Sequence, residues 1–421
     1  MPSSPGIKNR IIESSGRWAI VSLSHRAIDS LIHWSVPALI FHLFISEPWA
    51  VFNGSMNQWL NGPIPWGFLM SSNRTYTVVV AGMGKRGTHH AGAFQKNGRF
   101  QLVGLCDIDS GRLEAAAKKF GVGETSADAA ALVKKTHPDV FCFCTLPDLR
   151  LPLVRAGVEA GVKLIAYEKP TALSTNEALE MMKLVREAGV KTVVSHQHRY
   201  GEHYKKVKEI IGSGALGRVH TVYGHATGWM MHMMTHLIDY ARWYNDYAEA
   251  DWVAGQAHGT GKFADNHPSP DYIGGFIQFA NGVRGVIECG EGAPDVPEVD
   301  YWWRKCRIGA QGSEGFAEVL TGGGWRAVTR QGATSGPGSM DYEHDMGPYV
   351  QEIVDWLDDD NKPHPCNGES AYKDFEIMMG MCRSVVQRGK VKLPLGPGEP
   401  ELEALKKVLE ISPAYRLHDG A

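Results

Sequence analysis

Short apolar runs alternate with amphipathic segments from residue 75 to about residue 200, and this alternation constrains the fold more than any other feature of the chain. The apolar runs have the length of strands, and the segments between them have helical periodicity. The expected strands are residues 75–82, 100–107, 140–146, 163–170 and 190–197. Because these runs are almost continuously apolar, helices should cover both of their faces, as in a parallel sheet built from βαβ units.

The pattern changes after about Gly201, where strand-like runs follow one another in succession. Asn281 and Gly282 separate two of these runs, and this dipeptide is a strong signal for a β-hairpin. The expected strands are residues 251–259, 272–280, 282–290, 301–310 and 315–322. Such a succession predicts an α+β second half with a large, mostly antiparallel open sheet. Late helical patterns at 348–359 and 371–389 should pack back on one of the two halves.

Composition and charge limit the classes of function. The 421 residues are 43% hydrophobic and 21% charged, with a formal net charge of -3, which is an ordinary balance for a globular chain. No long basic stripe is present, so nucleic acid is not an expected partner. None of the seven cysteines forms a CxxC pair, and we expect a reducing compartment, the cytoplasm. Cys142 and Cys144 lie two apart in an apolar run and are expected to be small core residues.

A glycine-rich segment, GMGKRG at residues 82–87, directly follows the first expected strand and opens a helix. In this G-x-G-x-x-G spacing Gly82 permits the tight turn, and Gly84 lets the backbone approach a pyrophosphate. Gly87 lets the helix pack on the strand, and the N-terminus of the helix offers free N–H groups to phosphates. The segment therefore predicts a dinucleotide site.

The end of the second strand indicates which dinucleotide is bound. Asp107 lies about twenty residues after the glycines, where a carboxylate can bind the hydroxyls of the adenosine ribose. A carboxylate at this point would repel a 2′-phosphate, so NAD is favoured over NADP. The cations Lys85 and Arg86 lie close enough to weaken that preference, and NADP remains possible.

Glu168 and Lys169 lie side by side at the end of an apolar run and are followed by Pro170. An adjacent pair of opposite charges is usually a solvated surface feature. In an open α/β sheet, however, the carboxyl ends of the strands face the cofactor crevice, and charges at that edge are costly unless they are used. Their position therefore indicates that both side chains serve the site.

Together these segments resemble the glucose–fructose oxidoreductase/inositol dehydrogenase (Gfo/Idh/MocA) family. The shared marks are the glycine-rich start, the acidic residue that ends the second strand, a T-x-P segment at residues 145–147 and the E-K-P tripeptide at residues 168–170. The resemblance extends from about residue 75 to about residue 394. It implies an α/β fold with an N-terminal Rossmann dinucleotide-binding domain followed by the antiparallel α+β domain.

The resemblance also implies a domain organisation. We expect an N-terminal extension at 1–72, a Rossmann NAD-binding domain at 73–200, an α+β substrate-binding and oligomerisation domain at 201–395, and a C-terminal helix and tail at 396–421. The resemblance does not reach the first seventy residues, whose apolar stretch at 31–46 is shorter than the about 20 residues of a membrane span. A poorly ordered extension is favoured there. A tail that packs on the domain or on a partner subunit, and a membrane anchor, are the alternatives.

Individual residues receive roles from the resemblance. Lys169 is implied to lie between nicotinamide and substrate and to accept the proton of the reacting hydroxyl, and Glu168 is implied to bond a cofactor ribose. Burial or nearby cations lower the pKa of a lysine, so Lys169 could work as a base near neutral pH. The expected cofactor-binding residues are Gly82, Met83, Gly84, Arg86, Gly87, Asp107, Thr145, Pro147, Glu168 and Lys169.

The second-domain motif of the family, D-x-G-x-H-x-x-D, corresponds to residues 232–239. His236 and Asp239 match it, whereas His232 replaces the first aspartate. By analogy His236 bonds the substrate hydroxyl or shares its proton with Lys169, Asp239 orients His236, and His232 is an unusual third participant. His232 and His236 are four residues apart and share a helical face, so a metal ion held by this pair is an alternative that we do not favour.

Side chains near the domain junction and before the histidine helix are expected to contact the substrate. Aromatic faces stack on the C–H faces of sugars, and polar groups bind their hydroxyls. The expected contacts are His198, Arg199, Tyr200, Tyr223 and Trp229. Residues 301–305, which combine aromatics and cations, are expected either in this pocket or in a subunit interface. For His89, His90 and residues 267–271, a position on a loop or a helix surface is at least as good an interpretation as a functional role.

The expected function is NAD-dependent transfer of a hydride from a secondary hydroxyl of a sugar, polyol or glycoside. The first alternative is an NAD-dependent glycoside hydrolase or lyase that oxidises C3 transiently and eliminates the aglycone. The second is a non-catalytic NAD-binding regulatory protein, against which the intact Lys169 argues. The implied partners are a small carbohydrate and further copies of the chain, in a homodimer or homotetramer formed through the second-domain sheet. No membrane partner is expected.

Overall fold

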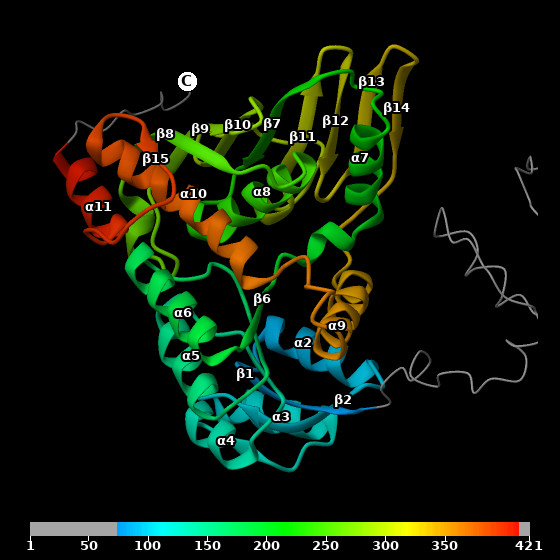
Figure 1. Ribbon diagram of the computed structural model, residues 1–421, viewed down its shortest axis with the longest axis vertical. Coiled ribbons are helices and arrows are strands. Elements are labelled where there is room, and N and C mark those ends of the chain that lie inside the picture. The colour runs from blue at the N-terminus through cyan, green and yellow to red at the C-terminus, as the bar shows by residue number, and fades with distance from the viewer. Residues whose placement is uncertain (1–73, 412–421) are drawn as a thin grey trace, which may run out of the picture. The chain divides into compact units, whose positions relative to one another are not determined.

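The computed structural model describes residues 74–411, which Figure 1 shows as a ribbon. The expectations for residues 1–72 and for the end of the tail lie outside the described residues. The described part forms two β-sheets. We propose that the boundary between the two domains lies near residue 200, where the chain passes from the first sheet to the second.

The first sheet has six parallel strands in the order β3-β2-β1-β4-β5-β6. The strands are β1 (Tyr76–Ala81), β2 (Phe100–Cys106), β3 (Thr125–Ser126), β4 (Val140–Phe143), β5 (Leu164–Tyr167) and β6 (Lys191–Val194). This order is that of a Rossmann fold, in which the glycine-rich turn follows the first strand. The predicted α/β fold of the first half is confirmed.

Helices cover both faces of this sheet, as the apolar strands require. Phe141 and Phe143 of β4 belong to a buried cluster on one face, and Cys142 belongs to a second cluster on the other face. The first face packs against α4 (Ala129–Thr136), α5 (Arg150–Glu159) and α6 (Thr175–Ala188), and the second packs against α2 (Lys85–Lys96) and α3 (Ser110–Phe120). Cys142 is the small core residue that we expected, whereas Cys144 is only partly buried.

Local signals set the ends of these helices. Asp109, Asp128 and Ser174 occupy the N-caps of α3, α4 and α6, and each accepts a hydrogen bond from a backbone N–H of the first turn. Gly189 ends α6 with φ +64°, a backbone conformation that glycine adopts without strain. The short connections that result bring the carboxyl ends of the strands to one edge of the sheet.

The second sheet has nine strands in the order β14-β13-β12-β11-β7-β10-β9-β8-β15. Its strands are β7 (Val219–Ala226), β8 (Ala250–His258), β9 (Tyr272–Phe279), β10 (Arg284–Gly290), β11 (Cys306–Gly312), β12 (Gly315–Leu320), β13 (Gly324–Thr329), β14 (Gly332–Gly336) and β15 (Val391–Lys392). Only β7 and β10 pair in parallel among the ladders of this sheet, so the prediction of a mostly antiparallel sheet is confirmed. The expected hairpin joins β9 to β10, and Gly282 in its turn has φ +84°.

One predicted strand is wrong at its start. Residues 301–310 were expected to be a strand, but Trp302–Arg304 form a short 3-10 helix (η7), and β11 begins only at Cys306. Tyr301 has φ 64°, a left-handed conformation that breaks the extended path before the strand begins. Trp302 and Trp303 therefore lie in a turn. In a strand, their side chains would have pointed to opposite faces of the sheet.

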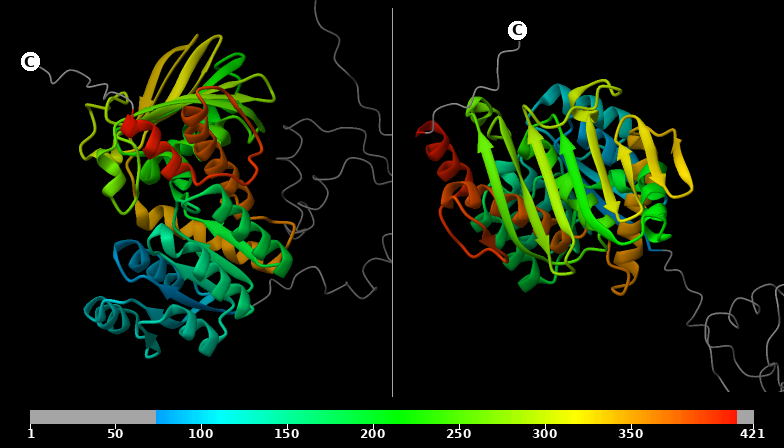
Figure 2. Two further views of the ribbon diagram at one scale, coloured as in Figure 1. Left: turned by 90° about the vertical axis from the view of Figure 1, so that its left-hand side faces the viewer. Right: turned by 90° about the horizontal axis from the view of Figure 1, so that it is seen from above.

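Within residues 74–411, helices cover one face of the second sheet and none covers the other. They are α7 (Glu202–Gly212), α8 (Met230–Tyr244) and α10 (Gly368–Gln387), with α11 (Glu401–Ile411) packed on α10. The helix α8 can approach β7 closely because the strand presents a glycine to it. A Cβ on Gly224 of β7 would lie only 2.8 Å from Leu237 Cβ of α8. In the right-hand view of Figure 2 the strands lie in front and the helices behind them.

The chain returns to the first domain through α9 (Tyr342–Asp358). Met346, Tyr349 and Ile353 of this helix are buried in the cluster under α2, on the face of the first sheet opposite α5 and α6. The ring hydroxyl of Tyr76 in β1 also donates to Asp358 Oδ1 at 2.8 Å. The prediction that late helices pack back on a domain is therefore correct for α9, which closes one side of the site.

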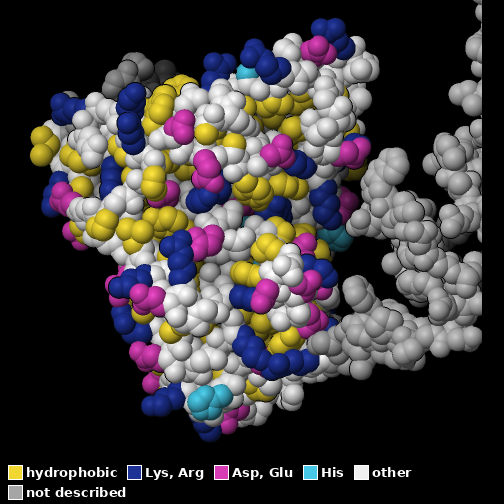
Figure 3. Space-filling view, in the orientation of Figure 1, with side chains coloured by type: hydrophobic (Ala, Val, Ile, Leu, Met, Phe, Trp, Pro, Cys, Tyr) yellow, Lys and Arg dark blue, Asp and Glu magenta, His cyan; other side chains and the backbone are white. Residues whose placement is uncertain are grey.

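The surface carries charges of both signs. Figure 3 shows Lys and Arg side chains interspersed with Asp and Glu side chains over the face that is drawn, without a field of one sign. Among residues 74–411, no helix combines the length and the apolar character that crossing a membrane would need.

Candidate active site

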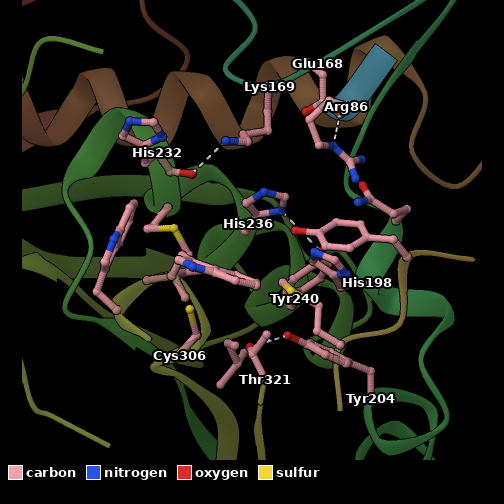
Figure 4. A pocket seen from close by; sticks show the side chains of 18 residues that line it. Arg86, Glu168, Lys169, His198, Tyr204, His232, His236, Tyr240, Cys306 and Thr321 are labelled. Carbon is pink, nitrogen blue, oxygen red and sulfur yellow. Dashed lines mark hydrogen bonds and ion pairs between the residues drawn. The ribbon is translucent and has the colours of Figure 1, made fainter. Parts of the chain in front are cut away.

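A cavity of about 230 Å³ lies between the carboxyl ends of β5 and β6 and the helix α8 of the second domain (Figure 4). Lys169 follows β5, His198 follows β6, and His236 lies on α8, so segments that are far apart in sequence form its walls. The tryptophans of η7 and Tyr342 of α9 close the remaining sides. Ligands bind at the carboxyl ends of strands in open α/β sheets, which makes this cavity the candidate active site.

Lys169 extends from the end of β5 toward the first turn of α8. Its Nζ donates a hydrogen bond to the backbone carbonyl of His232 at 3.0 Å. Burial, against the opposing effect of Glu168 and together with the nearby guanidinium groups of Arg86 and Arg150, lowers the pKa of this lysine to about 8. The amine is therefore poised to lose its proton near neutral pH, as a general base must.

Glu168, the neighbour of Lys169, is held by two side chains of α2. Its Oε1 lies 2.9 Å from Arg86 Nε and 3.1 Å from His90 Nε2. Although burial raises the pKa of this carboxyl, Arg86 and His90 outweigh burial and hold the pKa well below its usual range. Glu168 is thus a fixed negative charge beside the lysine, and its expected bond to a cofactor ribose stays a prediction.

For His90 the sequence left a helix-surface position and a functional role both open, and the structure excludes the surface position. Its side chain is fully buried, with Nε2 toward Glu168 and Nδ1 3.6 Å from Cys142 Sγ. The signal was present in the sequence: Gly87, His90, Ala91 and Phe94 recur with helical spacing, and all four are buried. A histidine on that stripe had to face the sheet.

His236 lies at the centre of the histidines in Figure 4. Its Nδ1 is 3.3 Å from the Tyr240 hydroxyl, and its ring centroid is 5.1 Å from that of His196 and 5.8 Å from that of His198. Burial, followed by the neighbours His196 and Lys169, lowers the pKa of His236 well below its usual range. The ring is therefore neutral and can donate one hydrogen bond and accept another.

His232 lines the same cavity, but its ring lies at one end of it, away from His236 (Figure 4). Its Nε2 is 3.7 Å from Asp265 Oδ1, and its ring stacks on that of His267 with centroids 4.0 Å apart. The shared helical face predicted for His232 and His236 holds, since both side chains line the cavity. The ligand atoms that approach His232 come from Asp265 and His267, so the structure gives the His232–His236 metal pair no support.

Asp239 lies beneath the cavity rather than in its wall. It is buried, and neither carboxylate oxygen has a hydrogen-bond partner among the described residues. Burial and the neighbouring carboxylate of Asp374 together raise the pKa of Asp239 to about 8. No hydrogen bond connects Asp239 to His236 in the described part of the chain, so the expected orienting contact is not formed here.

The expected substrate contacts divide into two groups. His198 lines the cavity, and its Nδ1 lies 3.0 Å from Asp345 Oδ2. Trp229 does not reach the cavity itself, but it stacks on Trp302, which does, with centroids 4.6 Å apart. Trp302 and Trp303 lie in the cavity wall, and the alternative of a subunit interface for residues 301–305 stays a prediction.

Three other expected contacts lie outside the cavity. Arg199 and Tyr200 are buried: Arg199 donates to the carbonyl of Pro365 at 3.2 Å, and the Tyr200 hydroxyl donates to Glu352. Tyr223 is on the open face of the second sheet, where its hydroxyl donates to Glu318 at 2.6 Å. Successive strand residues face opposite sides, and Gly224 is the neighbour that faces α8.

Several side chains of the cavity wall were not foreseen from the sequence. Tyr342 lies under the guanidinium of Arg86, with Cζ 4.5 Å from the ring centroid, and its ring is 5.2 Å from that of His198. The other additions are Tyr204, Met233, Leu237, Tyr240, Cys306, Ile308, Thr321 and Met340. These residues belong to many separate elements, and no motif spacing connects them.

The glycine-rich loop has the geometry that a dinucleotide needs. Gly82 has φ +86°, and a Cβ on Gly87 would lie 1.7 Å from the carbonyl oxygen of Gly82. A Cβ on Gly84, by contrast, would meet only Arg112 Nη1 at 3.8 Å, so this glycine faces open space where a pyrophosphate can approach. Gly84 also caps α2 without a side-chain hydrogen bond, which leaves the first N–H groups of the helix for phosphate.

The remaining expected cofactor residues lie around this loop. Asp107 Oδ2 accepts a hydrogen bond from the backbone N–H of Met83 at 2.6 Å, so the acidic residue also fixes the loop. Thr145 Oγ1 accepts from Arg150 Nη1 at 3.0 Å, and Pro147 begins the short 3-10 helix η4 (Pro147–Leu149). The residues present therefore fit a bound NAD, and the expected contact of Asp107 with the adenosine ribose stays a prediction.

Comparison with known proteins agrees with this geometry. Residues 76–196 match the GFO_IDH_MocA model of an oxidoreductase family with an NAD-binding Rossmann fold. D-apiose dehydrogenase of Paraburkholderia graminis is 32% identical over 144 residues, which are 34% of this chain and 38% of that protein. Myo-inositol 2-dehydrogenase of Thermotoga maritima is 27% identical over 145 residues, which are 34% of this chain and 43% of that protein. The match spans less than half the length of these two curated relatives.

Solved structures share the fold over a longer stretch. An oxidoreductase from Agrobacterium radiobacter, in complex with NAD+, L-tartaric acid and magnesium, has a TM-score of 0.63 at 17% identity and covers 75% of this chain and 98% of its own. GenD2 from gentamicin A biosynthesis, in complex with NAD, has a TM-score of 0.62 at 20% identity and covers 79% and 100%. These similarities show a common fold. Residues 76–196 therefore form a Rossmann domain of the NAD-binding type that the GFO_IDH_MocA oxidoreductase family model describes.

Proposed function

We propose that this protein is an NAD-dependent dehydrogenase that oxidises a secondary hydroxyl of a sugar, polyol or glycoside. The observation that carries the proposal is the buried amine of Lys169, with its pKa lowered to about 8, in a cavity beside the dinucleotide loop. The relatives named as dehydrogenases of apiose and of myo-inositol support a polyhydroxylated substrate.

The proposed mechanism assigns the proton to this chain's own residues. Bound NAD supplies the acceptor for the hydride. Lys169 Nζ takes the proton of the reacting hydroxyl, and neutral His236 bonds the same oxygen and holds it in line. The fixed charge of Glu168 stabilises the lysinium that forms. Trp302 and Trp303 offer aromatic faces to the C–H groups of the sugar ring.

A screen of sugars, polyols and glycosides with NAD and with NADP tests this function. We expect net formation of NADH and of a keto product, with a preference for NAD because Asp107 would repel a 2′-phosphate. Release of an aglycone without net NADH would instead support the glycoside hydrolase or lyase. Binding of NAD without turnover of any compound would support the regulatory protein.

The rate of the proposed reaction should rise with pH through about 8 and then level off. Lys169 accepts a proton only after losing its own, and its pKa is lowered from the ordinary lysine value to about 8. Below that pH the amine is protonated and the rate falls as pH falls. The measurement is kcat/KM against pH, which reports the ionisation of the free enzyme. A midpoint at the ordinary lysine pKa of about 10.4 would contradict the role of Lys169 as base.

A matched pair of variants checks the electrostatic origin of this midpoint. The carboxylate of Glu168 raises the pKa of Lys169, so Glu168→Gln should move the midpoint to lower pH. Glu180 is an exposed carboxylate of α6 that pairs with Arg155, and Glu180→Gln should leave the midpoint unchanged. A shift to higher pH in Glu168→Gln would show that another group controls the profile.

Further copies of the chain are the second proposed partner. The open face of the second sheet carries Tyr223, His225 and Arg307, and its helix-free side offers a broad surface for a homodimer or homotetramer. Free cysteines support the proposal of a reducing compartment such as the cytoplasm: all seven lie within the described residues, and none of them is in a disulfide there.

A further inference from the structure

Three side chains that can ligate a metal ion meet at one end of the cavity. His232 lies in the first turn of α8, and Asp265 and His267 lie between the short 3-10 helix η6 (Gly261–Ala264) and β9. One ligand atom from each side chain lies within 4.8 Å of the other two. All three residues are partly exposed, so an ion can reach them from solvent.

The spacing of these atoms suits an ion that binds nitrogen and oxygen. His232 Nε2 lies 3.7 Å from Asp265 Oδ1. Two ligands of a tetrahedral zinc ion are about 3.3 Å apart, given metal–ligand distances of about 2.0–2.2 Å, so a small closure of the side chains would complete this pair. The rings of His232 and His267 stack with centroids 4.0 Å apart, which brings a second imidazole beside the first.

Hydrogen bonds fasten the two loop ligands to the helix turn that carries the third. The backbone N–H of His267 donates to Asp265 Oδ1 at 2.8 Å. Ser269 Oγ donates to the carbonyl of His267 at 3.0 Å and accepts from the backbone N–H of Met231 at 3.1 Å. Because Met231 directly precedes His232, the ligands are already held together before any ion binds, which lowers the cost of binding.

His267 Nδ1 lies 2.8 Å from Asn266 Oδ1. A proton on Nδ1 would be donated to that oxygen and would leave the Nε2 lone pair for the ion, as in most histidines that bind metals.

We propose that His232, Asp265 and His267 bind one divalent metal ion of the zinc class at the rim of the cavity. Two imidazoles and one carboxylate are the donor set that such ions prefer, and three protein ligands leave an open coordination position. The backbone carbonyl of His232 accepts the hydrogen bond of Lys169, so the amine lies beside the residue that supplies one of the three ligands. The open coordination position would take an oxygen of the substrate adjacent to the reacting hydroxyl. This role rests on the proposed function, whereas the binding of the ion does not.

Charges nearby set the expected strength of binding. Asp265 is the single carboxylate of the site, and Lys169 and Lys262 are neighbouring cations, the latter 5.0 Å from the ring of Trp229 that packs on His232. We therefore expect weaker binding than in a site with two carboxylates. A negatively charged or chelating oxygen from a substrate would complete the coordination and strengthen it.

The other clusters of three ligand groups among the described residues suit a metal less well. His196, Asp239 and Asp374 are fully buried, and Arg242 Nη1 lies 2.5 Å from Asp374 Oδ1, so a cation is already present there. The second cluster, His90, Cys142 and Cys144, uses the histidine that is committed to Glu168 at 3.1 Å.

Spectroscopic titration with cobalt tests the site without relying on activity. The full chain is stripped with EDTA and titrated with Co²⁺, whose visible absorption reports a low-coordinate site, and with Zn²⁺ by calorimetry. We expect one ion per chain. His267→Ala and Asp265→Asn should weaken binding by at least about 100-fold, and Asn266→Ala should weaken it by roughly 10-fold, because it removes the partner that orients His267.

A matched control excludes non-specific binding by other histidines. His258 of β8 also stacks on an aromatic ring, that of Tyr272, with centroids 5.1 Å apart, but it belongs to none of the clusters among the described residues. His258→Ala should bind Co²⁺ like the parent chain. Equal binding by the parent and His267→Ala, or no saturable binding by the parent, would overturn the proposal.

The same proteins separate this proposal from the proposed function. Binding of NADH, followed by its fluorescence, should be the same in all variants, because the dinucleotide loop is distant in sequence from residues 265–267. A chain that binds Co²⁺ through these residues but oxidises no polyol would uphold the site and overturn the function. Full activity after EDTA treatment, with no bound metal on titration, would overturn the site and uphold the function.

Discussion

Replacing Lys169 by alanine is expected to lower kcat by about 10²- to 10⁴-fold, the range that a positioned general base contributes. The amine is directed into the cavity by its bond to the carbonyl of His232, and its lowered pKa makes it the side chain of the wall that can lose a proton near neutral pH and regain it in the reaction. The measurement is steady-state turnover with the best substrate of the screen, together with NADH binding by fluorescence. Binding should change little, because the dinucleotide loop lies on another segment.

Two further variants distinguish a role of Lys169 as proton acceptor from a role as a positive charge only. Lys169→Arg keeps the charge, but a guanidinium cannot lose its proton in a protein, so it should be as inactive as the alanine variant. Lys163 lies just before the opposite end of β5 and pairs with Asp139 at 2.8 Å, and Lys163→Ala should turn over normally. Near-normal turnover in Lys169→Ala would refute the proton-acceptor role, and activity in Lys169→Arg alone would reduce it to charge stabilisation.

The parts of the site that lie in one continuous motif could be predicted from the sequence. The loop at residues 82–87 has the turn and the close contact that its glycines indicate, and Glu168 and Lys169 lie at the strand end where an apolar run stops. These signals are local: a backbone turn without a Cβ, or a charge at the end of a buried strand, constrains its own surroundings.

The wrong predictions concern side chains whose direction depends on register or on packing. Tyr223 and Gly224 are adjacent in β7, and which of them faced α8 depended on where the helix would pack. The smaller residue faces the helix because only it permits the close approach of Leu237. Arg199 and Tyr200 follow β6 within η5 (Gln197–Tyr200), and they turn into the interior toward Pro365 and Glu352 rather than into the cavity.

The unforeseen residues of the cavity come from segments that only the tertiary fold brings together. Tyr342 lies on a helix more than two hundred residues after Arg86, and it reaches the site because α9 packs on the first domain. The group of His232, Asp265 and His267 likewise joins a helix to a loop. Sequence spacing cannot reveal such groups, because long-range packing rather than helical or strand periodicity sets their distances.

Replacing Gly87 by alanine is expected to destabilise the first domain by at least about 1–3 kcal/mol, the usual cost of overpacking a tight contact. The new Cβ would lie 1.7 Å from the carbonyl oxygen of Gly82, so either α2 or the loop must shift. The shift should also weaken NAD binding by about 100-fold or more, because each hydrogen bond to a charged phosphate contributes about 1.5–3 kcal/mol. Urea unfolding and NADH fluorescence measure the two effects.

Alanine variants of Gly84 and Gly92 distinguish weaker NAD binding that comes from a destabilised domain from weaker NAD binding that comes from a blocked pyrophosphate site. A Cβ on Gly84 meets only Arg112 Nη1 at 3.8 Å, so Gly84→Ala should lower the free energy of unfolding by less than about 1 kcal/mol, the difference between glycine and alanine at an N-cap. It should still weaken NAD binding, because the methyl group enters the space of the pyrophosphate. Gly92 lies within α2, where a Cβ would meet Phe120 at 3.8 Å, and Gly92→Ala should bind NAD normally and gain up to about 1 kcal/mol from helix propensity. If Gly84→Ala bound NAD as tightly as the parent chain, the phosphates could not lie against this turn, and the cofactor would have to bind elsewhere on the domain.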